Sequence, residues 1–299
     1  MAHNVAIKPH VRNALLACVV VMAAMGAAQA TERETLMLMA NDREWPITTI
    51  QINGQVTPAL LDTGATIALI DDDLLAYQPS ETDAFETRVL GIGGQRLFPV
   101  THVSSLSAGA RSWYGLRVAV NTKDEFPVQQ NVLPTSLFGA SIIDFDFPND
   151  RVELYDGYPK FVHGSHRSAI SYIQHEGLIF IPIRINGVRG KALLDTGASV
   201  SFVNTRFADQ ARGVPRVEEE QDIQGSDLER NRVRIYNFRK LRFGDNQLAR
   251  FSLPVFETDL FATLGFEDEP MMVMGMDILK HFRVQLDQKR QRVVMLRDE

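Results

Sequence analysis

Two aspartates in this chain stand in nearly identical surroundings, and their pairing is the first chemistry that the sequence offers. The six residues Leu-Leu-Asp-Thr-Gly-Ala occur at 60–65 and again at 193–198, which places Asp62 and Asp195 at the same point of each copy. Two carboxylates held about 3 Å apart cannot both ionise, so they share one proton and supply an acid and a base together. Such a pair can activate a water for attack on a carbonyl without a metal or a covalent intermediate.

The residues around each aspartate repeat as well, which predicts a duplicated lobe. Ile-Asn-Gly stands nine positions before each aspartate, counted from its asparagine, at 52–54 and at 185–187. The alternating residues before each Asn-Gly predict strands, and Asn-Gly predicts a tight turn. Downstream, Asp71 and Asn204 occupy matching positions, each as a predicted helix N-cap. We therefore expect two lobes of roughly 130 residues with one plan of strand, turn, strand and acid.

Further segments also match between the lobes. Residues 89–100 hold three glycines between apolar runs and predict a mobile hairpin, with residues 222–236 as its counterpart. The lobes close with similar apolar-apolar-Gly elements at 137–143 and 273–279, each followed by a terminal strand. Asp144-Phe145-Asp146 is interpreted as a polar turn before the last strand of the first lobe.

The N-terminus predicts export. Residues 1–30 carry two basic residues, an apolar stretch and the small-residue ending Ala28-Gln29-Ala30, which is typical of a cleavable signal peptide. An uncleaved membrane anchor is the alternative, although the apolar run is shorter than the about 20 residues that a spanning helix needs. We expect a periplasmic or secreted protein with a signal peptide at 1–30, lobes at 31–157 and 178–299, and an interlobe linker at 158–177.

Composition excludes several function classes. Cys18 is the only cysteine, so the chain beyond residue 30 can form no disulfide and must be stabilised by burial. The formal net charge of −6 does not favour nucleic acid as a partner. A Gly-x-Ser-x-Gly motif and a zinc-protease histidine pair are both absent. Three histidines in the linker are interpreted as exposed side chains rather than metal ligands, and no metal or cofactor is expected.

The doubled Asp-Thr-Gly-Ala, the glycine-rich hairpin and the apolar-apolar-Gly closing elements resemble those of the aspartic proteases. More narrowly, the chain resembles the retropepsin-like proteins of the bacterial cell envelope, with both lobes on one chain as in pepsins. The resemblance covers residues 48–296, and two motifs in register are more specific than one. It implies an all-β, two-lobe acid-protease fold of β-barrel lobes with pseudo-twofold symmetry and a few short helices.

The resemblance also implies roles for individual residues. Asp62 and Asp195 would be the catalytic pair of an endopeptidase that hydrolyses extended segments of envelope proteins. Thr63 and Thr196 would interlock their hydroxyls between the lobes, and Gly64 and Gly197 would give backbone amides to the carboxylates. The flap over the substrate would contain Gly91, Ile92, Gly93 and Gly94, with Gly225 in the matching hairpin. A monomer with both lobes on one chain is expected.

One departure from the pepsin pattern predicts a different working pH. Pepsin-type motifs have Ser or Thr where this chain has Ala65 and Ala198. Losing a hydrogen bond to a charged carboxylate raises its pKa, so we expect an optimum less acidic than that of pepsin. Two alternatives remain open: a catalytically silent peptide-binding module of the same fold, and independent lobes that pair with other chains.

Overall fold

The computed structural model describes residues 33–40, 44–75, 85–91, 94–122, 131–224 and 230–298. The expected export signal at 1–30 and the predicted flap residues Ile92, Gly93 and Gly225 lie outside these ranges. Within the ranges, none of the helices combines the length and the apolar character needed to cross a membrane.

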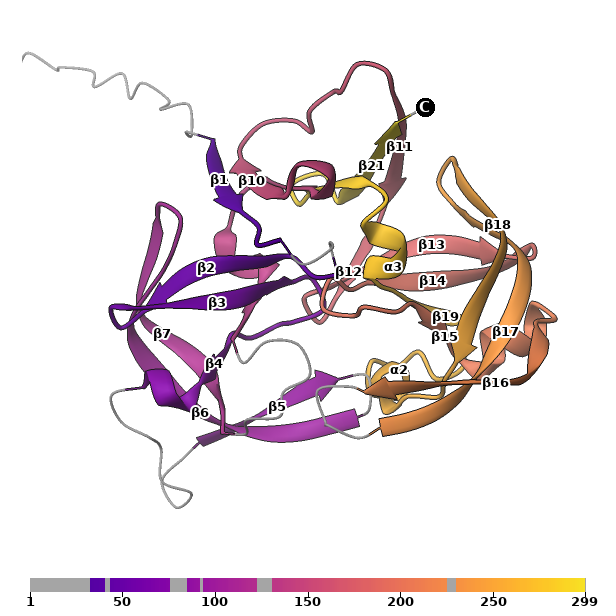
Figure 1. Ribbon diagram of the computed structural model, residues 1–299, viewed down its shortest axis with the longest axis horizontal. Helices are drawn as coiled ribbons and strands as arrows, with labels where there is room; N and C mark the ends of the chain where they lie inside the picture. The colour runs from indigo at the N-terminus through magenta and orange to yellow at the C-terminus, as the bar shows by residue number, and fades with distance from the viewer. Residues whose placement is uncertain are drawn as a thin grey trace, which may run out of the picture. The chain divides into compact units, whose positions relative to one another are not determined.

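A seven-stranded sheet carries the first copy of the repeat (Figure 1). Its strands pair in the order β2, β3, β8, β4, β7, β6 and β5, and β2 also pairs with β6, so that the sheet closes on itself. The bounds are β2 (Ile47–Ile52), β3 (Gln55–Asp62), β4 (Leu69–Asp71), β5 (Phe85–Gly91), β6 (Gly94–Ala108), β7 (Arg111–Asn121) and β8 (Val132–Pro134).

An eight-stranded sheet carries the second copy. The order is β12, β13, β14, β19, β15, β18, β17 and β16, and a further β13–β17 pairing closes it in the same way. The bounds are β12 (Ile173–His175), β13 (Leu178–Ile185), β14 (Val188–Leu194), β15 (Phe202–Val203), β16 (Val214–Gln224), β17 (Arg230–Phe243), β18 (Asn246–Val255) and β19 (Met271–Met274). The fold is therefore all-β with two lobes, as predicted.

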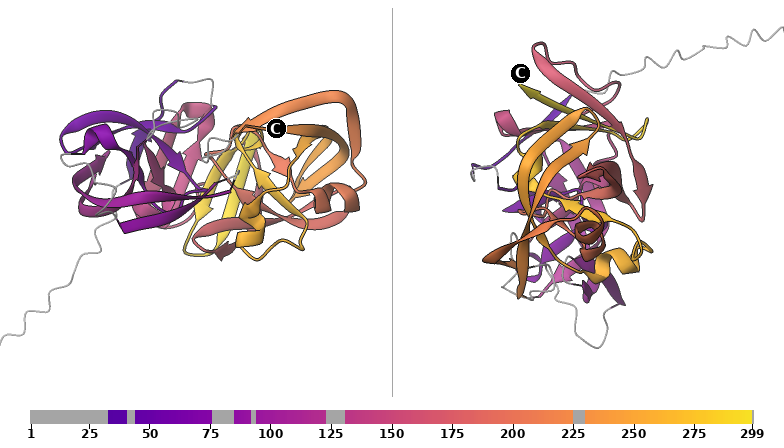
Figure 2. Two further views of the ribbon diagram at one scale, coloured as in Figure 1. Left: turned by 90° about the horizontal axis from the view of Figure 1, so that it is seen from below. Right: turned by 90° about the vertical axis from the view of Figure 1, so that its right-hand side faces the viewer.

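A six-stranded sheet joins the lobes. It contains β1 (Glu34–Met37), β9 (Ile142–Asp146), β10 (Arg151–Tyr155), β11 (Ser165–Ser171), β20 (Arg283–Asp287) and β21 (Arg292–Asp298). The order is β1, β10, β9, β20, β21 and β11, so β9 of the first lobe pairs antiparallel with β20 of the second. Figure 2 shows the two lobes beside each other, the first in indigo to magenta and the second in orange to yellow.

The segment expected as a linker, residues 158–177, contains the strands β11 and β12. In β11 only Ser168 and Ile170 are buried, and the residue between them, Ala169, is exposed. Because one of the two buried residues is a serine and an exposed one is an alanine, the sequence lacks the apolar–polar alternation that is typical of a strand. The segment connects the lobes and also adds an edge strand to their shared sheet.

Helices are short and few in the described residues. The α-helices are α1 (Thr205–Gln210), α2 (Asp259–Thr263) and α3 (Met276–Leu279), and the 3-10 helices are η1 (Asp72–Leu74), η2 (Thr135–Phe138) and η3 (Phe147–Asn149). Asp71 caps η1 through its side chain, and Asn204 caps α1 by accepting a hydrogen bond from the Phe207 amide. Both predicted N-caps are confirmed.

The two Asn-Gly turns explain why Ile-Asn-Gly is repeated. Asn53 and Gly54 have φ of 49° and 87°, and Asn186 and Gly187 have φ of 50° and 92°. Positive φ at both central residues is the geometry of a tight hairpin turn that Asn-Gly favours. Each asparagine side chain also ties its hairpin to the rest of its lobe. The partners are Ser105 and Leu74 for Asn53, and Lys240 and Ala211 for Asn186.

Asp144-Phe145-Asp146 is not the polar turn that the sequence suggested. These residues form most of β9, and the side chains of Asp144 and Asp146 are 0% and 2% exposed. Burial is possible because Arg283 on β20 reaches both carboxylates, with N–O distances of 2.8 Å and 3.0 Å, and also Glu153 at 2.9 Å. Burial lowers the pKa of Arg283, but the hydrogen bonds and charges of the three carboxylates, Asp144 above all, outweigh this effect and raise it overall.

Arg283 should therefore hold the shared sheet together, and Arg283→Ala tests this. Removing one partner of a buried ion pair leaves uncompensated charges, which typically costs about 3–5 kcal/mol of unfolding free energy. Urea unfolding at neutral pH measures the loss. Arg206→Ala is the control, because Arg206 and its partner Asp268 lie at the surface and such pairs contribute about 1 kcal/mol or less. Equal losses in both variants would contradict this role for Arg283.

Candidate active site

The two repeated aspartates stand at equivalent ends of strands. Asp62 is the last residue of β3, and Asp195 directly follows β14. Each of these strands pairs in parallel with another strand of its lobe, β3 with β8 and β14 with β19. The closing element at 273–279 begins within β19, and the one at 137–143 begins shortly after β8. Their repetition therefore reflects a shared way of ending the strand that pairs with the acid-bearing strand.

Thr63 and Thr196 link the two copies through reciprocal hydrogen bonds. The Thr63 hydroxyl accepts from the Thr196 amide at 3.0 Å and donates to the Leu194 carbonyl at 2.7 Å. The Thr196 hydroxyl accepts from the Thr63 amide at 3.0 Å and donates to the Leu61 carbonyl at 2.7 Å. Both threonines are buried. This interlock brings the aspartate-bearing turns of the two lobes against each other.

Gly64 and Gly197 make room for the opposite carboxylate. A Cβ atom on Gly64 would lie 2.6 Å from the Asp195 carboxyl group, and one on Gly197 would lie 2.6 Å from that of Asp62. Contacts this short do not occur for real Cβ atoms, so each position requires glycine while the opposite carboxylate stays in place. The glycine amides also donate to the aspartate of their own turn, at 2.6 Å from Gly64 and 2.8 Å from Gly197.

The environment of the pair favours retention of a proton. Burial and then the charge of Asp195 raise the pKa of Asp62 well above its ordinary value. Burial also raises the pKa of Asp195, against the hydrogen bond from the Gly197 amide. A hydrogen bond between the two side chains raises the pKa of Asp62 and lowers that of Asp195. This pattern fits one proton shared by two carboxyl groups, with the larger share on Asp62.

The Asp195 turn has a further polar support, which was not predicted from the sequence. The Asp277 carboxylate accepts hydrogen bonds from both the amide and the hydroxyl of Ser201, and that hydroxyl accepts from the Gly275 amide. Burial raises the pKa of Asp277, although the Ser201 hydrogen bonds oppose this. The sequence did offer one indication of this support, because an acid, Asp277, stands two residues after Gly275 in the closing element.

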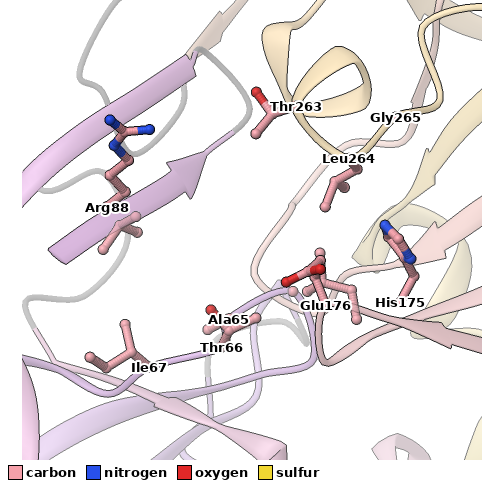
Figure 3. A pocket seen from close by; sticks show the side chains of 12 residues that line it. Ala65, Thr66, Ile67, Arg88, His175, Glu176, Thr263, Leu264 and Gly265 are labelled. Carbon is pink, nitrogen blue, oxygen red and sulfur yellow. The ribbon is translucent and has the colours of Figure 1, made fainter.

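A pocket of about 480 Å³ lies beside the aspartates, and Figure 3 shows its lining. The first lobe contributes Gly64, Ala65, Thr66, Ile67, Arg88 and Val89, and the second contributes His175, Glu176, Leu178, Thr263, Leu264 and Gly265. Apolar side chains mix with charged ones, and Arg88 lies across the pocket from Glu176 (Figure 3). The pocket is large enough for side chains of a bound ligand.

The structure brings together only some of the predicted site residues. Asp62, Thr63, Gly64 and their three counterparts meet at one point, as the bonds above describe. Gly91 and Gly94 pair with each other where β5 and β6 meet, and neither is part of the pocket lining. Arg88 and Val89 of the same hairpin do line it, as do His175 and Glu176. His175 was expected to be an exposed linker histidine, but it ends β12 directly before the turn at Glu176 and Gly177.

No set of three or more His, Cys, Asp or Glu side chains suited to a metal ion occurs among the residues described.

Comparisons with known proteins agree with this geometry. A sequence profile of the family described as aspartyl protease matches residues 48–142 and 181–278, one copy of the repeat each. The fold is similar to that of an aspartic proteinase from Irpex lacteus, with a TM-score of 0.54 over 90% of this chain and 98% of that chain. Sequence identity to that protein is 11%, so the likeness concerns the fold alone. A search of curated proteins gives no match.

Raised pKa values predict how Asp62 affects stability. The folded state holds the shared proton more tightly than the unfolded state does. The stabilisation that this proton gives is fully present below the pKa of Asp62 in the unfolded chain, and it is lost as the pH rises through the pKa of Asp62 in the folded protein. Asp62→Asn removes this loss and should raise the free energy of unfolding at pH 7, by about 1.4 kcal/mol for each unit of pKa shift. Urea unfolding at pH 7 and near pH 4 measures the gain, which should shrink at the lower pH.

The exposed residue Asp209 supplies the control, since Asp209→Asn should leave stability nearly unchanged at both pH values. A loss of stability in Asp62→Asn at pH 7 would contradict a proton held by the pair.

Proposed function

We propose, from the premise that this chain belongs to the aspartyl protease family, that Asp62 and Asp195 are its catalytic pair and hydrolyse peptide bonds. The observation that supports this most is the crossed packing at the site, in which each aspartate carboxylate fills the space left by the opposite glycine. Two carboxyl groups so close, both with raised pKa values, supply an acid and a base together.

The two aspartates take different roles in this proposal. Backbone amides lower the pKa of both carboxyl groups, those of Gly197 and Ala198 for Asp195 and those of Gly64 and Gly197 for Asp62. The charge of Asp195 and the hydrogen bond between the two side chains raise the pKa of Asp62, and the same hydrogen bond lowers that of Asp195, so we assign Asp195 as the ionised member and Asp62 as the protonated one. Asp195 takes a proton from a water molecule while the oxygen of that water attacks the peptide carbonyl carbon. The Asp62 proton polarises the carbonyl oxygen, and the pair then protonates the leaving nitrogen.

The substrate in this proposal is an extended stretch of polypeptide. The pocket beside the aspartates is lined by both lobes and by the β5–β6 hairpin, which offers a strand for backbone pairing with a bound peptide. Apolar residues such as Ile67 and Leu264 alternate in the lining with Arg88 and Glu176, so the pocket can take both apolar and polar side chains of the peptide. Exposed or unfolded segments of cell-envelope proteins meet this requirement, and they are the substrates that we propose on the basis of the predicted export.

Substituting either aspartate tests the catalytic pair. Asp62→Asn and Asp195→Asn should each lower kcat by at least about 100-fold, the lower range for general acid–base catalysis, because the pair then lacks either its acid or its base. A quenched-fluorescence peptide library measures the cleavage rate, and circular dichroism checks that the fold is retained.

Asp71→Asn is the matched control, because Asp71 lies in the same lobe but caps η1, and asparagine preserves the cap. Full activity in either dyad variant would overturn the assignment. Peptide binding by the wild type without any cleavage would instead support the silent binding module.

The pH dependence of cleavage is a second test. No hydroxyl stands at position 65 or 198 to stabilise a charged carboxylate, and burial raises both pKa values. We expect the activity maximum well above the acidic range of pepsin, whose pair titrates at about 1.5 and 4.7. Ala65→Ser and Ala198→Ser should move the acid limb of the kcat/KM profile to lower pH. A wild-type maximum near pH 2 would contradict the expectation.

A further inference from the structure

Three arginines lie side by side on the outer face of the second lobe. Arg184 on β13 pairs directly with Arg189 on β14 and, on its other side, with Arg242 on β17. Residues directly opposite in antiparallel strands present their side chains on the same face, with Cβ atoms about 5 Å apart. All three arginines are exposed. Arg184 is thus flanked by a like charge on both sides.

These arginines line a pocket of about 420 Å³ together with Pro182, Gly190 and Gly244. None of the described residues in its lining is a carboxylate. Arg184 hydrogen-bonds the Gly187 carbonyl at 3.3 Å, and no ion pair of the three arginines is found in the part of the chain that the structure describes. By contrast, Arg283 and Arg290 each face a carboxylate within 3.1 Å.

Like charges directly opposite each other destabilise a sheet. The chain has 37 acidic residues against 31 basic ones, so a lack of acidic residues does not explain why the cluster is uncompensated. A bound anion would remove the repulsion, and guanidinium groups match phosphate oxygens through paired hydrogen bonds.

The first lobe shows that the fold does not require these arginines. Its β2–β3 hairpin and β6 have the same register, with Gln51 opposite both Val56 and Ser107. Gln51 even repeats the side-chain hydrogen bond of Arg184, to the Gly54 carbonyl at 3.1 Å. The repeat thus places three uncharged residues where the second lobe has three arginines, so the charge cluster is a property of the second lobe alone.

We propose that Arg184, Arg189 and Arg242 form a binding site for a phosphate-type oxyanion, either free phosphate or the phosphate of a lipid headgroup. The site shares no lining residue with the pocket beside Asp62 and Asp195, so it is separate from catalysis. Its function is to hold the protein to a phosphate-bearing ligand or surface through the second lobe.

The first lobe supplies the variant for the test. Arg184→Gln, Arg189→Val and Arg242→Ser together install the residues that the equivalent register positions of the first lobe hold. Calorimetry with inorganic phosphate should show binding to the wild type and binding at least about tenfold weaker to this triple variant, since each lost charge-assisted hydrogen bond is worth a tenfold change or more. Phosphate should also raise the Tm of the wild type more than that of the variant.

A control variant separates this site from net charge. Arg167→Gln, Arg292→Gln and Arg297→Gln remove the same charge from exposed positions on β11 and β21 and should bind phosphate like the wild type. Flotation with vesicles of phosphatidylcholine, with and without phosphatidylglycerol, is the second arm. Binding to inorganic phosphate but to neither kind of vesicle identifies the free ion as the ligand. Binding that requires phosphatidylglycerol in the vesicles identifies the phosphate of an anionic lipid headgroup. Absence of both, or equal binding by the two triple variants, would overturn the proposal.

Discussion

The reciprocal hydrogen bonds of Thr63 and Thr196 are the interaction on which the site depends. Two carboxyl groups of like charge repel each other, and burial makes their ionisation still more costly. The threonine hydroxyls each satisfy an amide and a carbonyl of the opposite lobe, and a buried polar group left without its partner costs about 1–3 kcal/mol. The interlock therefore holds Asp62 and Asp195 together against their repulsion, and that repulsion is what raises the pKa of Asp62 beyond the effect of burial.

A second constraint acts at a distance from the aspartates. The lobes are joined through β9 and β20, where Arg283 of the second lobe meets Asp144, Asp146 and Glu153 of the first. The threonine interlock sets the short-range geometry, and this buried ion cluster fixes the register of the sheet that joins the lobes. Because the two contacts lie on different elements, the lobes are connected at two separate places.

Much of this arrangement could be predicted because the chain repeats itself. The doubled Asp-Thr-Gly-Ala, the Asn-Gly turns and the two N-caps depend on local geometry, and each residue type is the one that its backbone position requires. The strand β9 could not be recognised, because Asp144 and Asp146 are polar and their partner Arg283 is far along the chain. The strand β11 was hidden for a related reason, since only Ser168 and Ile170 are buried there. Pocket residues such as His175 and Glu176 come from a turn whose position depends on the packing of both lobes.

The two lobes share a backbone plan but differ in side-chain charge, and these differences carry the chain's individual properties. The sharing of one proton by Asp62 and Asp195 can be measured by ¹³C NMR titration of the aspartate carboxyl carbons. We predict that Asp62 titrates well above an ordinary aspartate in the wild type and that its pKa falls in Asp195→Asn, where the neighbouring charge is gone. An Asp62 that titrates as an isolated aspartate, with the same pKa in both proteins, would contradict the account.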